Sequence, residues 1–264
     1  MERKGDVAKE MLRVRVIPVL LLREGRMVKT KRFAETRDVG DPVTAARVYD
    51  AQGADELIFL DIDATAQNRP TLHKVIERVS EECFMPLAVG GGVRTVDDAR
   101  RLLAAGADKV VINTAAAQDP EFVDQVAEVF GDQCVVVSMD ARKTDLGYEV
   151  YTNGGKRSTG LNPRAWAKDL MRYHVGEILV TSIENEGLMQ GYDLNLVRTV
   201  AEVVNVPVIA HGGCGTLQHF VDAIQQANAS AVAAASLFHF TDQSPIKAHA
   251  FMSTAGIPVR TIYT

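Results

Sequence analysis

The amino-acid sequence predicts a (β/α)8 barrel, formed as one domain by residues 1–264 and built from two similar halves. Three observations lead to this prediction. The chain length suits a single barrel, short apolar runs alternate with helical patterns, and the second half of the chain repeats features of the first. Hydrophobic residues make up 47% of the chain and charged residues 24%, which is typical of a globular protein with a large core.

Apolar runs rich in Val, Ile, Leu and Ala are expected to form the barrel strands. They do not alternate strictly with polar residues, as is typical of parallel strands that are buried on both faces. In chain order, the expected strands are Val14–Leu22, Leu57–Ile62, Pro86–Val89, Lys109–Ile112, Cys134–Met139, Glu177–Ser182, Val206–Ala210 and Ala231–Ala235.

Amphipathic segments between these runs are expected to form the outer helices. Asp119-Pro120 and Asn162-Pro163 are start signals, because proline is well tolerated in the first helical turn. Residues 1–12 are expected to be a polar leader. The expected helices are Pro42–Gln52, Thr71–Glu82, Val96–Ala105, Pro120–Phe130, Pro163–Tyr173, Leu194–Val203 and Leu217–Gln226.

The repeat is clearest in two glycine-containing stretches. PLAVGGGVR begins at Pro86 and PVIAHGGCG begins at Pro207, and the same offset of 121 residues separates Glu56 from Glu177. Two half-barrels with a similar ligand site in each are therefore predicted. The alternative is the general likeness that all β/α units share.

Charge and cysteine usage exclude several classes of protein. The net charge of −5 argues against nucleic acid as a partner, because binding to phosphate backbones needs a basic surface. Cys83, Cys134 and Cys214 show no CxxC spacing, which favours reduced thiols and a cytoplasmic location. We find no signal peptide and no apolar run long enough for a bilayer, so no membrane partner is expected.

Glycine runs at residues 90–92 and 212–213 follow the third and seventh predicted strands. Without a Cβ atom, backbone N–H groups approach an anion closely, and the following helix directs its positive end to the same place. Asn113, Thr114 and Ser236 follow the fourth and eighth strands and add polar groups. The pattern predicts two phosphate sites, and hence a ligand with a charged group at each end. Tight turns without a ligand are the alternative.

Carboxylates follow several predicted strands, at the barrel face where catalytic groups usually lie. Asp61 and Asp63 follow the second strand, Asp140 the fifth, and Glu184 and Glu186 the sixth. Facing carboxylates at this end could perform general acid–base catalysis. Surface acids that cap loops are the other interpretation, and for Glu184 and Glu186 the two stay equally open.

Charged residues also stand at the starts of strands. Arg15, Glu56, Lys109 and Glu177 open the first, second, fourth and sixth strands. Since strand starts meet at one end of a barrel, two cations and two anions there are expected to pair across the axis and close it. Ordinary stabilisation of that end is the alternative.

A resemblance to a known family covers the chain from Arg15 to about Phe240. The sequence resembles the cyclase subunit of imidazole glycerol phosphate synthase, from histidine biosynthesis. The stretches that carry the resemblance are RVIPVLLLREGRMVKT, VGDP, GADELIFLDIDAT, PLAVGGGVRT, LLAAGADKVVINTAA, FGDQCVVVSMDARK, GEILVTSIENEG, GYDLNL, VPVIAHGGCG and AAASLFHF.

The resemblance implies a (β/α)8 barrel whose ligand carries a phosphate at each end. It also implies a glutaminase partner on the N-terminal face, contacted at Asp108, and passage of ammonia through the barrel. The implied ammonia gate consists of Arg15, Glu56, Lys109 and Glu177. Together with the pattern above, the resemblance gives as phosphate-binding candidates Gly91, Gly92, Asn113, Thr114, Thr181, Gly187, Gly212, Gly213 and Ser236.

The main departure from the family lies in the first strand. The family motif IPCLD places a catalytic aspartate where this chain has Leu21, which cannot transfer a proton. Its counterpart on the fifth strand, Asp140, is retained as the candidate catalytic residue. Glu184 and Glu186 stand where the family usually has aspartates, and His211 replaces a serine. These three are further possible catalytic groups, although a hydrogen-bonded rim position suits His211 slightly better.

The motif with leucine resembles a smaller paralogous family from bacterial surface-polysaccharide pathways. Its members are thought to act with a glutaminase and a further amidotransferase, converting an acetamido group on a nucleotide-linked sugar into an acetamidine. The leading hypothesis is therefore an ammonia-dependent synthase subunit acting on a phosphorylated or nucleotide-linked sugar. An authentic cyclase and a non-catalytic scaffold that activates a glutaminase are the alternatives. No pattern predicts a metal site or a cofactor.

Overall fold

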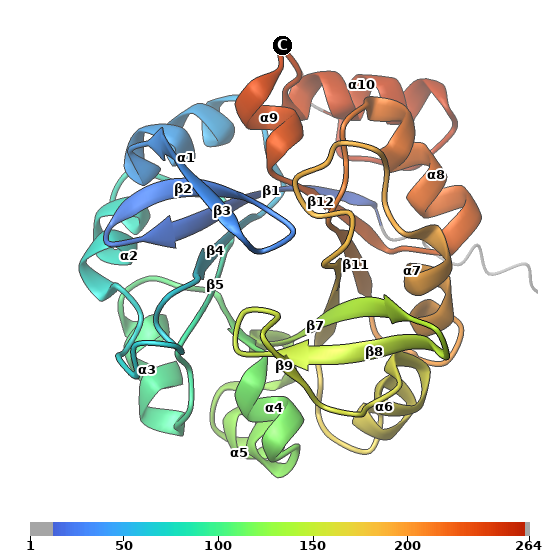
Figure 1. The fold of residues 1–264 in the computed structure, drawn as a ribbon. Helices are drawn as coiled ribbons and strands as arrows, with labels where there is room; N and C mark the ends of the chain where they lie inside the picture. The colour runs from blue at the N-terminus through green and yellow to red at the C-terminus, as the bar shows by residue number, and fades with distance from the viewer. Residues whose placement is uncertain (1–12, 262–264) are drawn as a thin grey trace, which may run out of the picture.

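The computed structural model describes residues 13–261, which form a closed barrel of parallel strands surrounded by helices (Figure 1). The leader predicted for residues 1–12 lies outside the described residues. The barrel closes because β12 pairs with β1 and β10 pairs with β7, which confirms the predicted fold class. In order around the ring, the strands are β1 (Arg15–Arg23), β4 (Leu57–Asp61), β5 (Leu87–Gly90), β6 (Lys109–Ile112), β7 (Val135–Thr144), β10 (Glu177–Ser182), β11 (Val208–His211) and β12 (Ala231–Ala234).

Helices follow the strands at the predicted places, with small differences in their bounds. Side chains of Asp41 and Asn162 accept hydrogen bonds from the first turns of α1 and α6, where proline occupies the first helical position. No helix within residues 13–261 is both long and apolar enough to cross a membrane. These helices are α1 (Pro42–Ala51), α2 (His73–Ser80), α3 (Val96–Ala104), α5 (Glu121–Phe130), α6 (Pro163–Leu170), α7 (Leu194–Ala201) and α8 (Leu217–Ala227).

Several elements were not predicted from the sequence. Strands β2 (Arg26–Lys31) and β3 (Glu35–Gly40) follow β1, and β8 (Gly147–Thr152) and β9 (Arg157–Ser158) follow β7. Figure 1 shows these two additions on opposite sides of the barrel mouth. They occupy equivalent positions in the two halves, as do two short helices that follow β6 and β12. The remaining helices are α4 (Thr114–Gln118), α9 (Ser236–Phe240) and α10 (Pro245–Thr254), and η1 (Asp132–Cys134) is a single 3-10 turn.

Each barrel strand contributes to two apolar layers. On β1, Leu20 and Leu22 pack toward the helices, whereas Ile17 and Val19 face the barrel axis. Both layers are buried, which explains why the strand sequences lack polar alternation. The axial layer comprises Ile17, Val19, Leu21, Val28, Ile58, Ala88, Val111, Val136, Leu179, Ile209, Ala231, Ala233 and Ala235.

Packing between the strands and the helices predicts that truncation of a buried apolar side chain changes the free energy of unfolding far more than truncation of an exposed one. Phe59 on β4 is fully buried there, whereas Leu146 in the β7–β8 turn is 98% exposed. We expect Phe59→Ala to lower the free energy of unfolding by about 3–5 kcal/mol, because it removes buried apolar area and leaves a cavity. Leu146→Ala is the control and should change it by less than about 0.5 kcal/mol in urea unfolding. Equal effects of the two substitutions would contradict this packing.

Candidate active site

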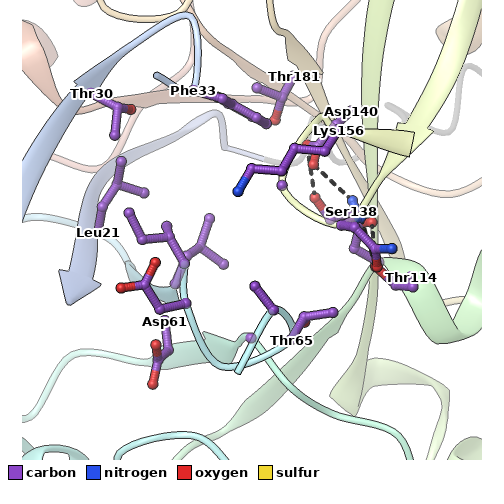
Figure 2. A pocket seen from close by; sticks show the side chains of 18 of the residues that line it. Leu21, Thr30, Phe33, Asp61, Thr65, Thr114, Ser138, Asp140, Lys156 and Thr181 are labelled. Carbon is purple, nitrogen blue, oxygen red and sulfur yellow. Dashed lines mark hydrogen bonds between the residues drawn. The ribbon is translucent and has the colours of Figure 1, made fainter. Parts of the chain in front are cut away.

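A large cavity opens at the C-terminal ends of the barrel strands and encloses about 1060 Å³, part of it open to solvent. Its lining comes from six barrel strands, the β2–β3 hairpin and the loop between β8 and β9. Figure 2 shows side chains from these elements around an open centre. This is the end of the barrel at which β/α-barrel enzymes place their active sites.

The two sides of the cavity differ in polarity. The first half of the barrel contributes apolar side chains, including Leu21 of β1 and Val111 of β6. The second half contributes Ser138, Asp140 and Thr181. In Figure 2, Leu21 lies across the cavity from Asp140 and Thr181. Leu21, at the position of the family's aspartate, has apolar neighbours, although the arginine-paired Asp61 and Asp63 line the same side of the cavity.

Asp140 is the ionisable group at the centre of the polar side. The Asn113 side-chain amide donates a hydrogen bond to Asp140 Oδ2 at 2.9 Å, and Ser138 Oγ lies 3.5 Å from Oδ1. Burial raises the pKa of the Asp140 carboxyl to about 7, despite hydrogen bonds from Thr181, Ser138 and Asn113 that favour its charged form. A carboxyl with this pKa exchanges a proton readily near neutral pH.

Leu21 is surrounded by apolar side chains, and no neighbouring strand within residues 13–261 places a carboxylate at its position. It is 5% exposed and lies in register with Leu60 of β4 and Val28 of β2. The surrounding side chains that face the axis are apolar. Among the described residues, no carboxylate therefore takes the place of the aspartate that the family motif has at the position of Leu21.

Asp61 and Asp63 do not offer free carboxylates for acid–base work, contrary to one reading of the sequence. Arg69 donates two hydrogen bonds to Asp61, at 2.6 and 2.9 Å, and Arg23 donates two to Asp63, at 2.7 and 2.9 Å. Such paired contacts hold both partners in fixed geometry. These residues brace the loops after β1 and β4.

Glu184 and Glu186, the two possible catalytic glutamates, lie in different environments. Glu184 is outside the lining of the cavity and pairs with Arg142 at 3.1 Å, so its predicted catalytic role is not supported. Glu186 is buried and lines the cavity, but it pairs with Lys29 at 2.8 Å and accepts a hydrogen bond from Thr30 at 2.9 Å. This buried ion pair fastens the β2–β3 hairpin to the loop after β10.

His211 fills a hydrogen-bonded position on β11. Its Nδ1 lies 3.1 Å from the Thr181 hydroxyl. Burial, with a smaller contribution from the nearby charge of Lys29, lowers the pKa of His211 to about 3. The imidazole is therefore neutral at physiological pH, which favours the hydrogen-bonded rim position over a role as acid or base near neutrality.

The predicted phosphate-binding residues form two separate groups, as the repeat suggests. Gly91, Asn113 and Thr114 line the large cavity. A second, smaller cavity of about 230 Å³ is lined by the remaining glycines, Ser236, Lys29 and Glu186. Thr181 also lines the large cavity, beside His211 and Asp140. Gly92 is not in either lining and donates its N–H to Thr65 Oγ1 at 3.2 Å. The glycines and Ser236 of the second group are Gly187, Gly212, Gly213 and Ser236.

Close packing of the backbone also requires glycine in both groups. Gly91 and Gly213 have φ values of +103° and +104°, which side-chain-bearing residues rarely adopt. A Cβ on Gly91 would collide with the Asp61 carbonyl, and one on Gly213 with the Gly191 carbonyl. Glycine at these positions is therefore explained by the fold alone, and it leaves the backbone accessible to a ligand as well.

At the opposite end of the barrel, four charged side chains converge on the axis. Arg15 contacts Glu56 directly and lies 2.9 Å from Glu177. Lys109 Nζ lies 2.8 Å from Glu56 and 3.0 Å from Glu177. The four side chains thus form a closed ring of alternating charge, hereafter the ionic ring. Asp108, next to it, is exposed and accepts a hydrogen bond from the Leu87 N–H at 2.8 Å.

Sequence reasoning missed several residues that line the large or the small cavity, among them Lys29, Phe33 and Lys156. Lys29 and Phe33 belong to the β2–β3 hairpin, and Lys156 belongs to the loop between β8 and β9. Strands β3 and β9 carry mostly exposed residues, and β2 is buried but has only two apolar residues in its sequence RMVKTK, so no strand was predicted in these segments. The double glycine before Lys156 was the one available signal of a tight turn.

A closed β/α barrel with ionisable side chains in a cavity at its strand ends is the arrangement found in β/α-barrel enzymes. Within that class, a family model described as "Histidine biosynthesis protein" matches residues 15–244. The chain belongs to this family of histidine-biosynthesis barrels, which supports an enzyme of that type.

The raised pKa of Asp140 predicts how pH affects stability. Between the ordinary aspartate pKa of 3.8 and the folded value of about 7, the folded chain holds a proton that the unfolded chain loses. This contribution to stability is therefore present at low pH and is lost as pH rises to 7. The Asp140→Asn side chain does not titrate, so the variant does not lose stability in this way. Its free energy of unfolding minus that of the wild type should therefore rise by up to about 4 kcal/mol from pH 4 to pH 8.

Urea unfolding of Asp140→Asn and the wild type at several pH values measures this difference. Asp145→Asn, in the exposed β7–β8 turn, is the matched control and should show no comparable gain. A constant difference between Asp140→Asn and the wild type across this pH range would rule out the raised pKa.

Proposed function

We propose that this chain is the synthase subunit of a glutamine amidotransferase complex, which takes ammonia from a glutaminase partner and adds it to an acceptor in the large cavity. One observation carries the proposal. The ionic ring closes one end of an apolar barrel axis, and the cavity with Asp140 opens at the other. A ring of this kind is suited to control entry at the partner-facing end.

The ring contains one side chain that is suited to act as the moving part. Lys109 bridges Glu56 and Glu177, but Arg15 contacts both glutamates too. If the flexible lysine swings away, Arg15 still compensates the two carboxylates, so opening does not leave them unpaired. A glutaminase docked over the exposed Asp108 next to the ring would lie close enough to release ammonia there.

The axial layer above the ring favours neutral ammonia. Its side chains are apolar, and several are small, including Ala88, Ala231 and Ala233. An ammonium ion would lose its hydration there without a counter-charge, whereas ammonia carries no net charge. The barrel would thus deliver the nucleophilic form to the cavity.

In the cavity, ammonia nitrogen would attack an electrophilic carbon of the acceptor, and Asp140 would accept or return the proton. The acceptor proposed is a phosphorylated or nucleotide-linked sugar, with anionic groups at the two glycine-containing sites. For an acetamido group, a C–N bond to ammonia forms and the amide C–O bond breaks. A further amidotransferase partner, supplied with a nucleoside triphosphate, would first convert that oxygen into a phosphate ester, which departs as the leaving group. Leu21 and its apolar neighbours suit an uncharged substituent of the acceptor.

An authentic cyclase that forms imidazole glycerol phosphate is the second candidate. Asp140 favours it, because a carboxyl with a pKa of about 7 is suited to the acid–base steps of ring closure. The apolar packing around Leu21 opposes it. A scaffold that only activates a glutaminase would need neither Asp140 nor the cavity.

Channelling can be tested with glutamine carrying ¹⁵N in its side-chain amide, in the complex with its glutaminase and excess unlabelled ammonium salt. If ammonia passes through the barrel, the amidine product of a nucleotide-linked acetamido sugar should keep the ¹⁵N label. Lys109→Met should let bulk nitrogen dilute the label severalfold. Lys168→Met, on the exposed face of α6, is the control. Full dilution in the wild type would exclude channelling, and absence of product would point to another acceptor or a scaffold.

Cyclase activity can be tested with ammonium salt and the ribulosyl intermediate of histidine biosynthesis. We expect turnover about 10²–10⁴-fold below that of a cyclase with both aspartates, since one acid–base group is missing. Leu21→Asp should raise turnover, and Leu21→Asn, which cannot exchange a proton in this range, should not. Wild-type turnover equal to that of such a cyclase would refute the leading proposal.

A further inference from the structure

Lys156 is a cation of the large cavity that the proposed function leaves unused. Among the described residues, two side chains of the lysine and arginine type line this cavity, Arg23 and Lys156. Arg23 is neutralised by Asp63, whereas no carboxylate lies within ion-pair distance of Lys156 among residues 13–261. In Figure 2, the Lys156 side chain extends from its loop toward the open centre of the cavity.

The turn that carries Lys156 is fixed at several points. Strands β8 and β9 pair up to Thr152 and Arg157, and the Lys156 N–H donates to the Thr152 carbonyl at 3.1 Å. The Asn153 N–H donates to Thr114 Oγ1 at 3.2 Å, so the turn is attached to the end of β6. Asn153, Gly154 and Gly155 all have positive φ values, between +53° and +75°.

Contact with the β2–β3 hairpin holds the turn on its other side. A Cβ on Gly155 would lie 2.9 Å from the Phe33 ring and 3.3 Å from Ile183 Cδ1. The backbone of the turn therefore packs closely against side chains from two other loops. Since the turn is held on both sides, the base of the Lys156 side chain is positioned before any ligand binds, and less conformational entropy is lost on binding.

The charges around Lys156 favour an anion as its partner. The carboxylates of Asp61, Asp63 and Glu186 are each engaged by another cation. The hydrogen bonds that the Asp140 carboxylate accepts come from polar neighbours on β6 and β7 and on β10, not from Lys156. Lys156 is thus the positive charge that remains uncompensated in the cavity.

We propose that Lys156 forms a third anion-binding position, in the open centre of the cavity, and is a specificity-determining residue for the ligand. It would hold a phosphate or carboxylate group carried in the middle of the ligand, between the two glycine-containing sites. A ligand with charges at its two ends alone would leave this lysine unpaired. The proposal goes beyond ammonia transfer and does not depend on it.

The first test observes the lysines directly by NMR, in the full-length protein. Reductive ¹³C-methylation keeps the charge of each lysine, and Lys156→Arg identifies the Lys156 signal. Pyrophosphate and acetate, titrated separately, are the phosphate and carboxylate probes. We expect the Lys156 signal to shift saturably with one of them, while that of Lys143, exposed on the neighbouring strand β7, does not. The anion that shifts Lys156 identifies the class of group bound.

The second test measures the affinity of that anion by calorimetry. Lys156→Met should weaken binding about tenfold, the usual effect of losing one hydrogen bond to a charged group. Lys156→Arg should retain most of the affinity, and Lys143→Met should be unchanged. No saturable shift at Lys156, or equal affinity in Lys156→Met, would overturn the proposal. Neither test uses a glutaminase or an acceptor, so failure of the proposed function would not affect the result.

Discussion

Closure of the parallel barrel is the constraint on which the other features depend. Because β12 pairs with β1 and β7 with β10, every strand start lies at one end and every strand end at the other. Four charged residues from strand starts therefore meet in the ionic ring, and residues at strand ends meet around the cavity. An open sheet would spread both sets along its edges, and neither the ring nor the cavity would exist.

The environment of each charge decides its chemistry more than its residue type does. Of six carboxylates compared at the strand ends and in the ring, only Asp140 combines burial with the lack of a paired cation. The carboxylates with a cation partner act as braces for loops. Asp140 alone is therefore suited to proton exchange near neutral pH, on a polar side of the cavity that faces an apolar one. The carboxylates compared are Glu56, Asp61, Asp63, Asp140, Glu177 and Glu186.

The alternatives that the sequence left open at the strand ends share one physical cause. Glu184 and Glu186 are two residues apart, but one pairs with Arg142 at the surface and the other with a buried lysine from a distant hairpin. His211 was weighed as an acid or base, and burial keeps it neutral. The ion pairing or protonation of each side chain depends on partners that the fold brings from far along the chain, and no local sequence pattern predicts those partners.

The sequence by itself determined the order of the eight barrel strands and of the seven helices predicted between them, the two-part repeat and the identity of the ring residues. These follow from local periodicity and from charged residues at strand starts, which are properties of short segments. Tertiary structure alone decided which charges are neutralised, how burial shifts the pKa of Asp140, and where Lys156 extends. Those properties arise from desolvation and from contacts between distant segments, which exist only once the barrel has closed.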